Sequence, residues 1–135
     1  MKRAIAGSIV GLMALGATLA AGAAEPNNQV KVEIQSVGLH ADMAPGTYVC
    51  AEGHFHVKGT VQNLTAVPVG PVKVAGKVFD ANGKLIGTAT ASTKRAVLNP
   101  NDTAEVNVEF LTVTGALIKR VKNQTLEVVA VGAKT

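Results

Sequence analysis

The chain has 135 residues, of which 16% are charged, a formal net charge of +4 and a single cysteine. Aromatic residues make up only 3%, so the rings that stack on bases are nearly absent and we expect no nucleic-acid partner. One cysteine cannot form a disulfide within the chain, so the fold must be held by apolar side chains.

The first 24 residues read as an export signal. Lys2 and Arg3 form a charged start, Ile5–Leu19 is an apolar segment, and the small residues 21–24 form a cleavage site. We therefore predict a cleaved signal peptide over 1–24, which places the protein in the periplasm or outside the cell.

An uncleaved membrane anchor is the alternative, because the apolar run from Ala4 to Ala24 is long enough to span a bilayer. That run is rich in alanine and glycine, however, and residues 25–28 after it are acidic and polar rather than basic. We expect no membrane span after cleavage, and a single domain over 25–135.

The first half of this domain contains two segments that alternate between apolar and polar residues. Residues 29–35 place Val30, Val32 and Ile34 on one face, which predicts a half-buried strand. Residues 36–45 read as a loop or a strand end. Residues 54–62 predict a second strand, whose solvent-facing side carries His54, His56, Lys58, Thr60 and Gln62.

The second half continues with strands and tight turns. Residues 72–79 and 84–91 predict two strands joined by a hairpin turn over Asp80–Gly83, in which Gly83 takes a positive φ. After a sharp turn at 98–102, the alternation is cleanest over 104–110. Residues 114–123 hold at most one helical turn. We expect the last strand, residues 126–131, to be central or well covered.

Short strands separated by turns, with no long helix, predict an all-β fold. We expect an antiparallel β-sandwich of about six to seven strands, with a small barrel as the alternative. The predicted buried side chains are Phe55, Val57, Val61, Val74, Val78, Val106, Val108 and Val128.

The order of several short motifs resembles that of FxLYD domains, which are small exported bacterial modules. The motifs are Gly59-Thr60-Val61-Gln62-Asn63, Val72-x-Val74, Val78-Phe79-Asp80-x-x-Gly83, Leu98-x-Pro100 and Ala104-x-Val106-x-Val108-x-Phe110. The family's eponymous motif falls on Gly76–Asp80, where Gly76 replaces the leading Phe. The resemblance covers about residues 53–131 and implies an immunoglobulin-like sandwich with no established catalytic residues.

One window of the sequence gathers most of the side chains that could bind a metal. It contains His40, Asp42, Met43, Cys50, Glu52, His54 and His56. His54 and His56 are two positions apart on one strand and share a face. Two imidazoles beside a thiolate suit zinc or copper, so we predict a candidate metal site at His54, His56 and Cys50. Two polar residues on a wet strand face, with no metal, are the alternative.

Cys50 has further interpretations. It could be a buried inert thiol, or it could form an intermolecular disulfide and so a linked dimer. A nucleophile served by His54 or His56 is disfavoured, because no oxyanion-hole motif accompanies it. We therefore expect no enzyme. The leading hypothesis is an exported binding or structural module of the bacterial cell envelope with an unknown protein or envelope partner; the alternative is a periplasmic copper- or zinc-binding protein.

Overall fold

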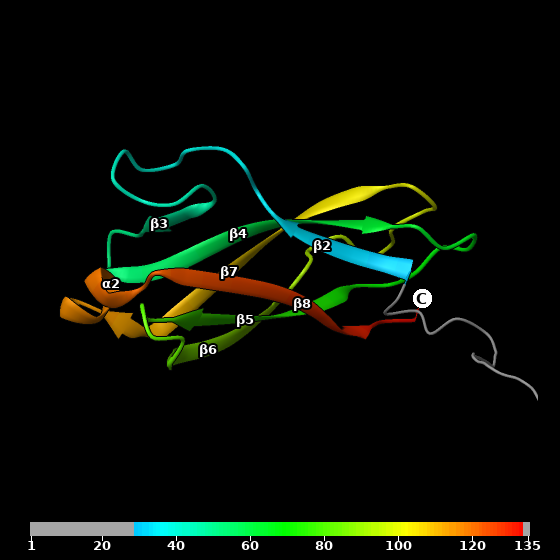
Figure 1. Ribbon diagram of the computed structural model, residues 1–135. Helices are drawn as coiled ribbons and strands as arrows, with labels where there is room; N and C mark the ends of the chain where they lie inside the picture. Colours follow the sequence, from blue (N-terminus) through cyan, green and yellow to red (C-terminus); the bar gives the residue numbers. More distant parts are fainter. Residues whose placement is uncertain (1–28, 134–135) are drawn as a thin grey trace, which may run out of the picture.

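The computed structural model describes residues 29–133, and the predicted signal peptide lies outside this range. The described chain is mostly strand, in two antiparallel sheets, which confirms the expected all-β sandwich (Figure 1). Its elements are β2 (Val30–Ile34), β3 (Thr47–Val49), β4 (His54–Asn63), β5 (Val72–Phe79), β6 (Leu85–Ser92), β7 (Thr103–Thr114), α2 (Ala116–Arg120) and β8 (Asn123–Val131).

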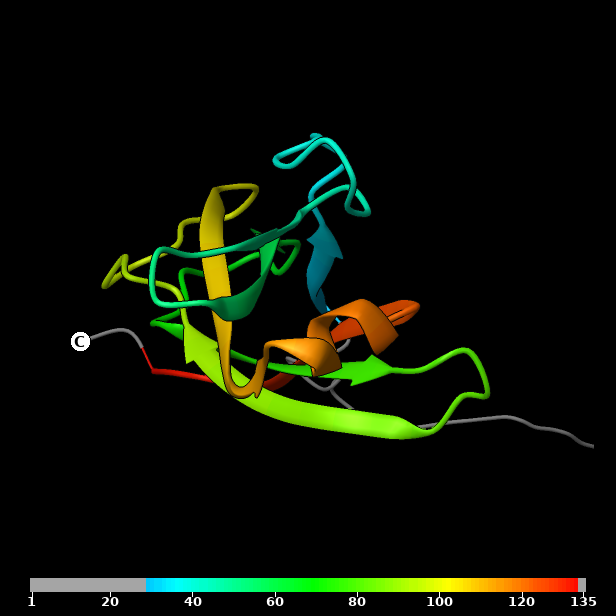
Figure 2. The same cartoon turned by 90° about the vertical axis from the view of Figure 1, so that its left-hand side faces the viewer.

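The two sheets contain four and three strands. In the first, β7 pairs along the length of β4, while β2 and β3 share the opposite edge of β4. The second has the order β6-β5-β8. Strand β4 pairs with β7 in the first sheet, and β5 pairs with β8 in the second. These pairings match those of strand B with strand E and of strand C with strand F in immunoglobulin-like sandwiches. Figure 2 shows the sandwich turned by 90°.

The core lies between the sheets and is built largely from valine, as the alternating pattern predicts. Seven of the eight predicted core side chains are buried. Val128 was predicted to be buried but is only half-buried. The reason is that β8 is an edge strand, which among the described strands pairs with β5 alone, so the expectation of a central or well-covered last strand was wrong.

Helix α2 follows β7 where the sequence allowed one helical turn. It has five residues, is preceded by Gly115 at φ 57°, and buries none of its side chains fully. Its apolar residues Leu117 and Ile118 are half-buried against the core. No helix in residues 29–133 is long and apolar enough to cross a membrane.

The hairpin turn between β5 and β6 has the predicted chemistry. Gly83 has φ 78°, and the Asp80 carboxylate accepts hydrogen bonds from the backbone N–H groups of Lys84 and Asn82, at 2.9 and 2.8 Å. The Lys84 and Asn82 bonds, together with the nearby Arg120 guanidinium, hold the pKa of Asp80 below its ordinary value of 3.8. The folded turn therefore favours the charged carboxylate.

We expect Asp80→Asn to lower the melting temperature at pH 7, because the amide keeps the shape of the turn but lacks the charge. A depressed pKa contributes stability above the ordinary value of 3.8, and this contribution is lost as the pH falls through the lower folded value. The difference in melting temperature between the wild type and the variant should therefore become smaller at acidic pH. Thermal melts from neutral to acidic pH test this, and a gap that does not change with pH would contradict it.

Candidate metal centre

The outer face of the four-stranded sheet carries a group of polar side chains from three strands. The pairing sets His56 of β4 between Tyr48 of β3 and Glu109 of β7. These side chains point away from the core because successive residues of a strand alternate between the two faces. The sheet register therefore brings together residues that are more than fifty positions apart in the chain.

Four of these side chains meet closely. One donor atom from each of Cys50, Glu52, His54 and Glu109 lies within 4.8 Å of all the others. His54 Nδ1 is 2.8 Å from Glu109 Oε2. The Cys50 thiol donates to Glu52 Oε1 at 3.6 Å and, more weakly, to Glu109 Oε2 at 4.0 Å. Glu52 is exposed, and the other three are partly buried.

The tight turn between β3 and β4 sets the geometry of this cluster. The Gly53 N–H donates to the Cys50 carbonyl at 2.9 Å, and the Cys50 N–H donates to the His54 carbonyl at 3.1 Å. Gly53 has φ 85°, a conformation that glycine adopts without steric cost. The turn thus folds Cys50 and Glu52 back beside His54.

His56 is more buried than the sequence indicated. It was predicted on a solvent-facing side, yet it is only 8% exposed. The cause is β3, a three-residue strand that the sequence analysis did not predict. Its Tyr48 ring stacks on the His56 ring, with centroids 4.6 Å apart and planes at 19°.

The hydrogen bonds around His56 favour a proton on its Nδ1 atom. The Asn107 amide donates to the Tyr48 hydroxyl at 2.6 Å, so the Asn107 Oδ1 atom is left to accept from His56 Nδ1 at 2.8 Å. In a neutral ring with a proton on Nδ1, Nε2 carries a bare lone pair. That Nε2 is buried, has no hydrogen-bond partner among residues 29–133, and lies 3.5 Å from Glu109 Oε2.

The structure thus divides the metal-ligand window of the sequence into two groups. Cys50, Glu52 and His54 join the cluster, with His56 beside it. His40 and Asp42, with Met43, instead line a separate cavity at the end of the sandwich.

Glu109 is the member of this cluster that the sequence did not indicate. It lies on the polar side of the cleanest alternating segment, which identified its face but not its partner strand. Only the pairing of β4 with β7 places it opposite His56.

Comparison with known proteins adds little. No family model matches the chain, and no curated protein does, so the resemblance to FxLYD domains stays a prediction. Among solved structures, the chain is similar to IrmA from Escherichia coli, with 14% identity, a TM-score of 0.48, and coverage of 76% of each chain. A likeness this distant carries no argument about function.

Proposed function

We propose that this chain is an exported, non-enzymatic binding domain whose ligand is a single transition-metal ion, held by Cys50, His54 and Glu109. Glu52 supplies a fourth donor from the exposed side. This ligand set keeps Cys50 and His54 of the site predicted from the sequence and adds the carboxylates of Glu52 and Glu109. His56, the third residue of that prediction, faces the same Glu109 oxygen with its Nε2 at 3.5 Å and offers the ion a further nitrogen donor.

The orphaned Nε2 of His56 is the observation that carries the proposal. His56 Nε2 and Glu109 Oε2 lie 3.5 Å apart, and a buried nitrogen that lacks a hydrogen-bond partner among residues 29–133 is costly. A metal ion coordinated by both atoms would supply that partner. The other ring nitrogen donates to Asn107, which is the arrangement that orients metal-binding histidines in general.

The donor types favour zinc. A thiolate, an imidazole and carboxylates are all ordinary zinc ligands, and four of them complete a tetrahedral site. Cu(I) prefers sulfur ligands, and the only cysteine is Cys50. Copper is therefore the second choice at this site.

The contacts of Cys50 support a binding role over catalysis. The thiol donates to the carboxylates of Glu52 and Glu109, so its side-chain neighbours are oxygen donors that also bind zinc. A divalent cation bound there would stabilise a coordinating thiolate directly.

A disulfide-linked dimer through Cys50 competes with metal binding, because both use the same partly exposed sulfur. The two are distinguished by a non-reducing gel of protein taken from the exported compartment. Under the metal-binding proposal the chain migrates as a monomer, and the thiol is protected from alkylation when zinc is present.

Zinc should raise the melting temperature of the reduced domain by roughly 10 °C at a metal concentration about 100 times Kd, because it binds the folded state alone. The shift should shrink between about pH 7.5 and pH 5.5, since protons compete for the nitrogen and sulfur donors. Differential scanning fluorimetry, with a chelator to reverse the effect, measures both. An unchanged melting temperature at every pH would refute zinc as the ligand.

A further inference from the structure

A second site lies at the end of the sandwich, between the loop that precedes β3 and helix α2. A cavity of about 400 Å³ opens there, within the range of about 300–1,000 Å³ typical of small-molecule sites. Figure 1 shows that the β2–β3 loop and α2 lie at the same end of the molecule. The cavity is separate from the metal cluster, because Val49 and Phe55 turn toward it from the inner face of the same hairpin.

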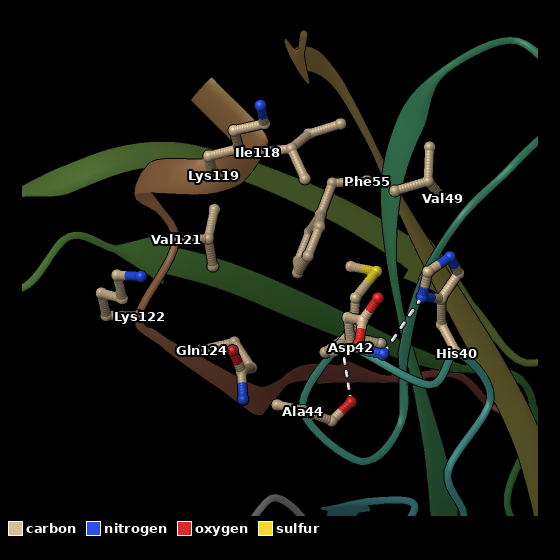
Figure 3. Close-up of a pocket in the computed structure, with 12 residues that line it drawn as sticks. His40, Asp42, Ala44, Val49, Phe55, Ile118, Lys119, Val121, Lys122 and Gln124 are labelled. Atoms are coloured by element: carbon tan, nitrogen blue, oxygen red, sulfur yellow. Dashed lines mark hydrogen bonds between the residues drawn. The ribbon is translucent and has the colours of Figure 1, made fainter. Parts of the chain in front are cut away.

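The interior of the cavity is largely apolar, with Thr47 and Gln124 as its uncharged polar residues. The ring of Phe55 projects into it between Val121 and Val49, with Ile118 above (Figure 3). Ile118 of α2 and Val121, the residue after the helix, pack against the core but are only partly buried, which leaves apolar surface uncovered at this end of the sandwich. A ligand with an apolar body would complete this packing.

The rim of the cavity is charged unevenly. Lys119 and Lys122 line one side, and Asp42 and His40 line the other (Figure 3). Within residues 29–133 neither lysine forms an ion pair, whereas Arg120 between them pairs with Asp80 at 3.6 Å. The lysine side is therefore a cationic rim without an anion.

From this combination of apolar interior and cationic rim, we infer that the cavity binds a small amphiphile with one alkyl chain and one carboxylate. The alkyl chain lies against Phe55 and Ile118. The carboxylate lies at Lys119 and Lys122, on the side away from Asp42. This inference is independent of the metal site.

Three probes that share the same alkyl chain test this inference: octanoate, octanol and octylammonium. Each is titrated into the reduced, metal-free domain. Methyl NMR follows the signals of Ile118, Val121 and Met43. Octanoate should bind about fivefold more tightly than octanol, as two partly exposed ion pairs allow, and octylammonium most weakly. The double variant Lys119→Ala/Lys122→Ala should bind octanoate and octanol equally.

Two controls separate the cavity from the general surface. Lys73→Ala/Lys77→Ala removes two exposed lysines from β5 and should leave octanoate affinity unchanged. Ile118→Trp fills the cavity and should abolish binding of all three probes. The inference is overturned if no probe shifts the three methyl signals, or if octanol binds as tightly as octanoate to the wild type.

Discussion

Replacing Cys50 with alanine is expected to weaken zinc binding by about 100-fold or more. Loss of an outer partner of a metal site alone costs about 10- to 100-fold in affinity, and Cys50 would be a direct ligand. The metal-free domain should melt as the wild type does, because Cys50 is partly exposed at a turn. Isothermal titration of zinc into the reduced protein measures the change.

The chain offers matched controls for the other two proposed ligands, His54 and Glu109. His54→Ala and Glu109→Gln should also weaken binding strongly. His40→Ala, outside the cluster, and Glu105→Gln, on the same face of β7, should not. Equal losses in the ligand variants and their controls would mean that zinc binds the surface without a specific site.

His56 is not a suitable first target for mutation. It is buried and stacked on Tyr48, so His56→Ala would remove packing as well as a nitrogen donor. Substitutions at Cys50 and His54 are preferable, because they remove a donor atom without removing the stacked ring of His56.

Phe110→Ala is expected to destabilise the fold by about 3–5 kcal/mol, through lost burial and the cavity that remains. Phe110 is fully buried, and its ring packs against Phe55 with centroids 6.0 Å apart. The ring also fills the space over Gly76, where an added Cβ would come within 2.8 Å of it. Urea denaturation gives the change in free energy of unfolding.

Leu111→Ala is the matched control for Phe110→Ala. Leu111 is the next residue of the same strand but is 65% exposed, so its truncation should change the free energy of unfolding by about 0.5 kcal/mol or less. A Phe110 effect as small as that of Leu111 would contradict the assignment of the core.

The strands were largely predictable, because alternation reveals a strand with one buried face. Residues 72–79 were predicted with the bounds that β5 has, and the Asp80–Gly83 turn was identified by its own side chains. Two features of the fold could not be predicted from the local sequence. The edge position of β8 depends on which strand pairs with it, and β3 is only three residues long, too short to show a period.

The candidate site was predictable only in part, for the same reason. Cys50 and His54 lie in one short segment, so their proximity could be expected from the sequence. Glu109 comes from another strand, and Tyr48 covers His56 from a strand too short to detect. The burial that leaves His56 Nε2 without a partner is therefore a property of the folded sheet.

Native mass spectrometry of the reduced domain, residues 25–135, during zinc titration tests the central claim most directly. We expect one zinc ion per chain, held until chelator is added and absent from a Cys50→Ala/His54→Ala double variant. Wild-type protein that stays metal-free, or that takes up the same number of ions as the double variant, would contradict a metal centre at Cys50, His54 and Glu109.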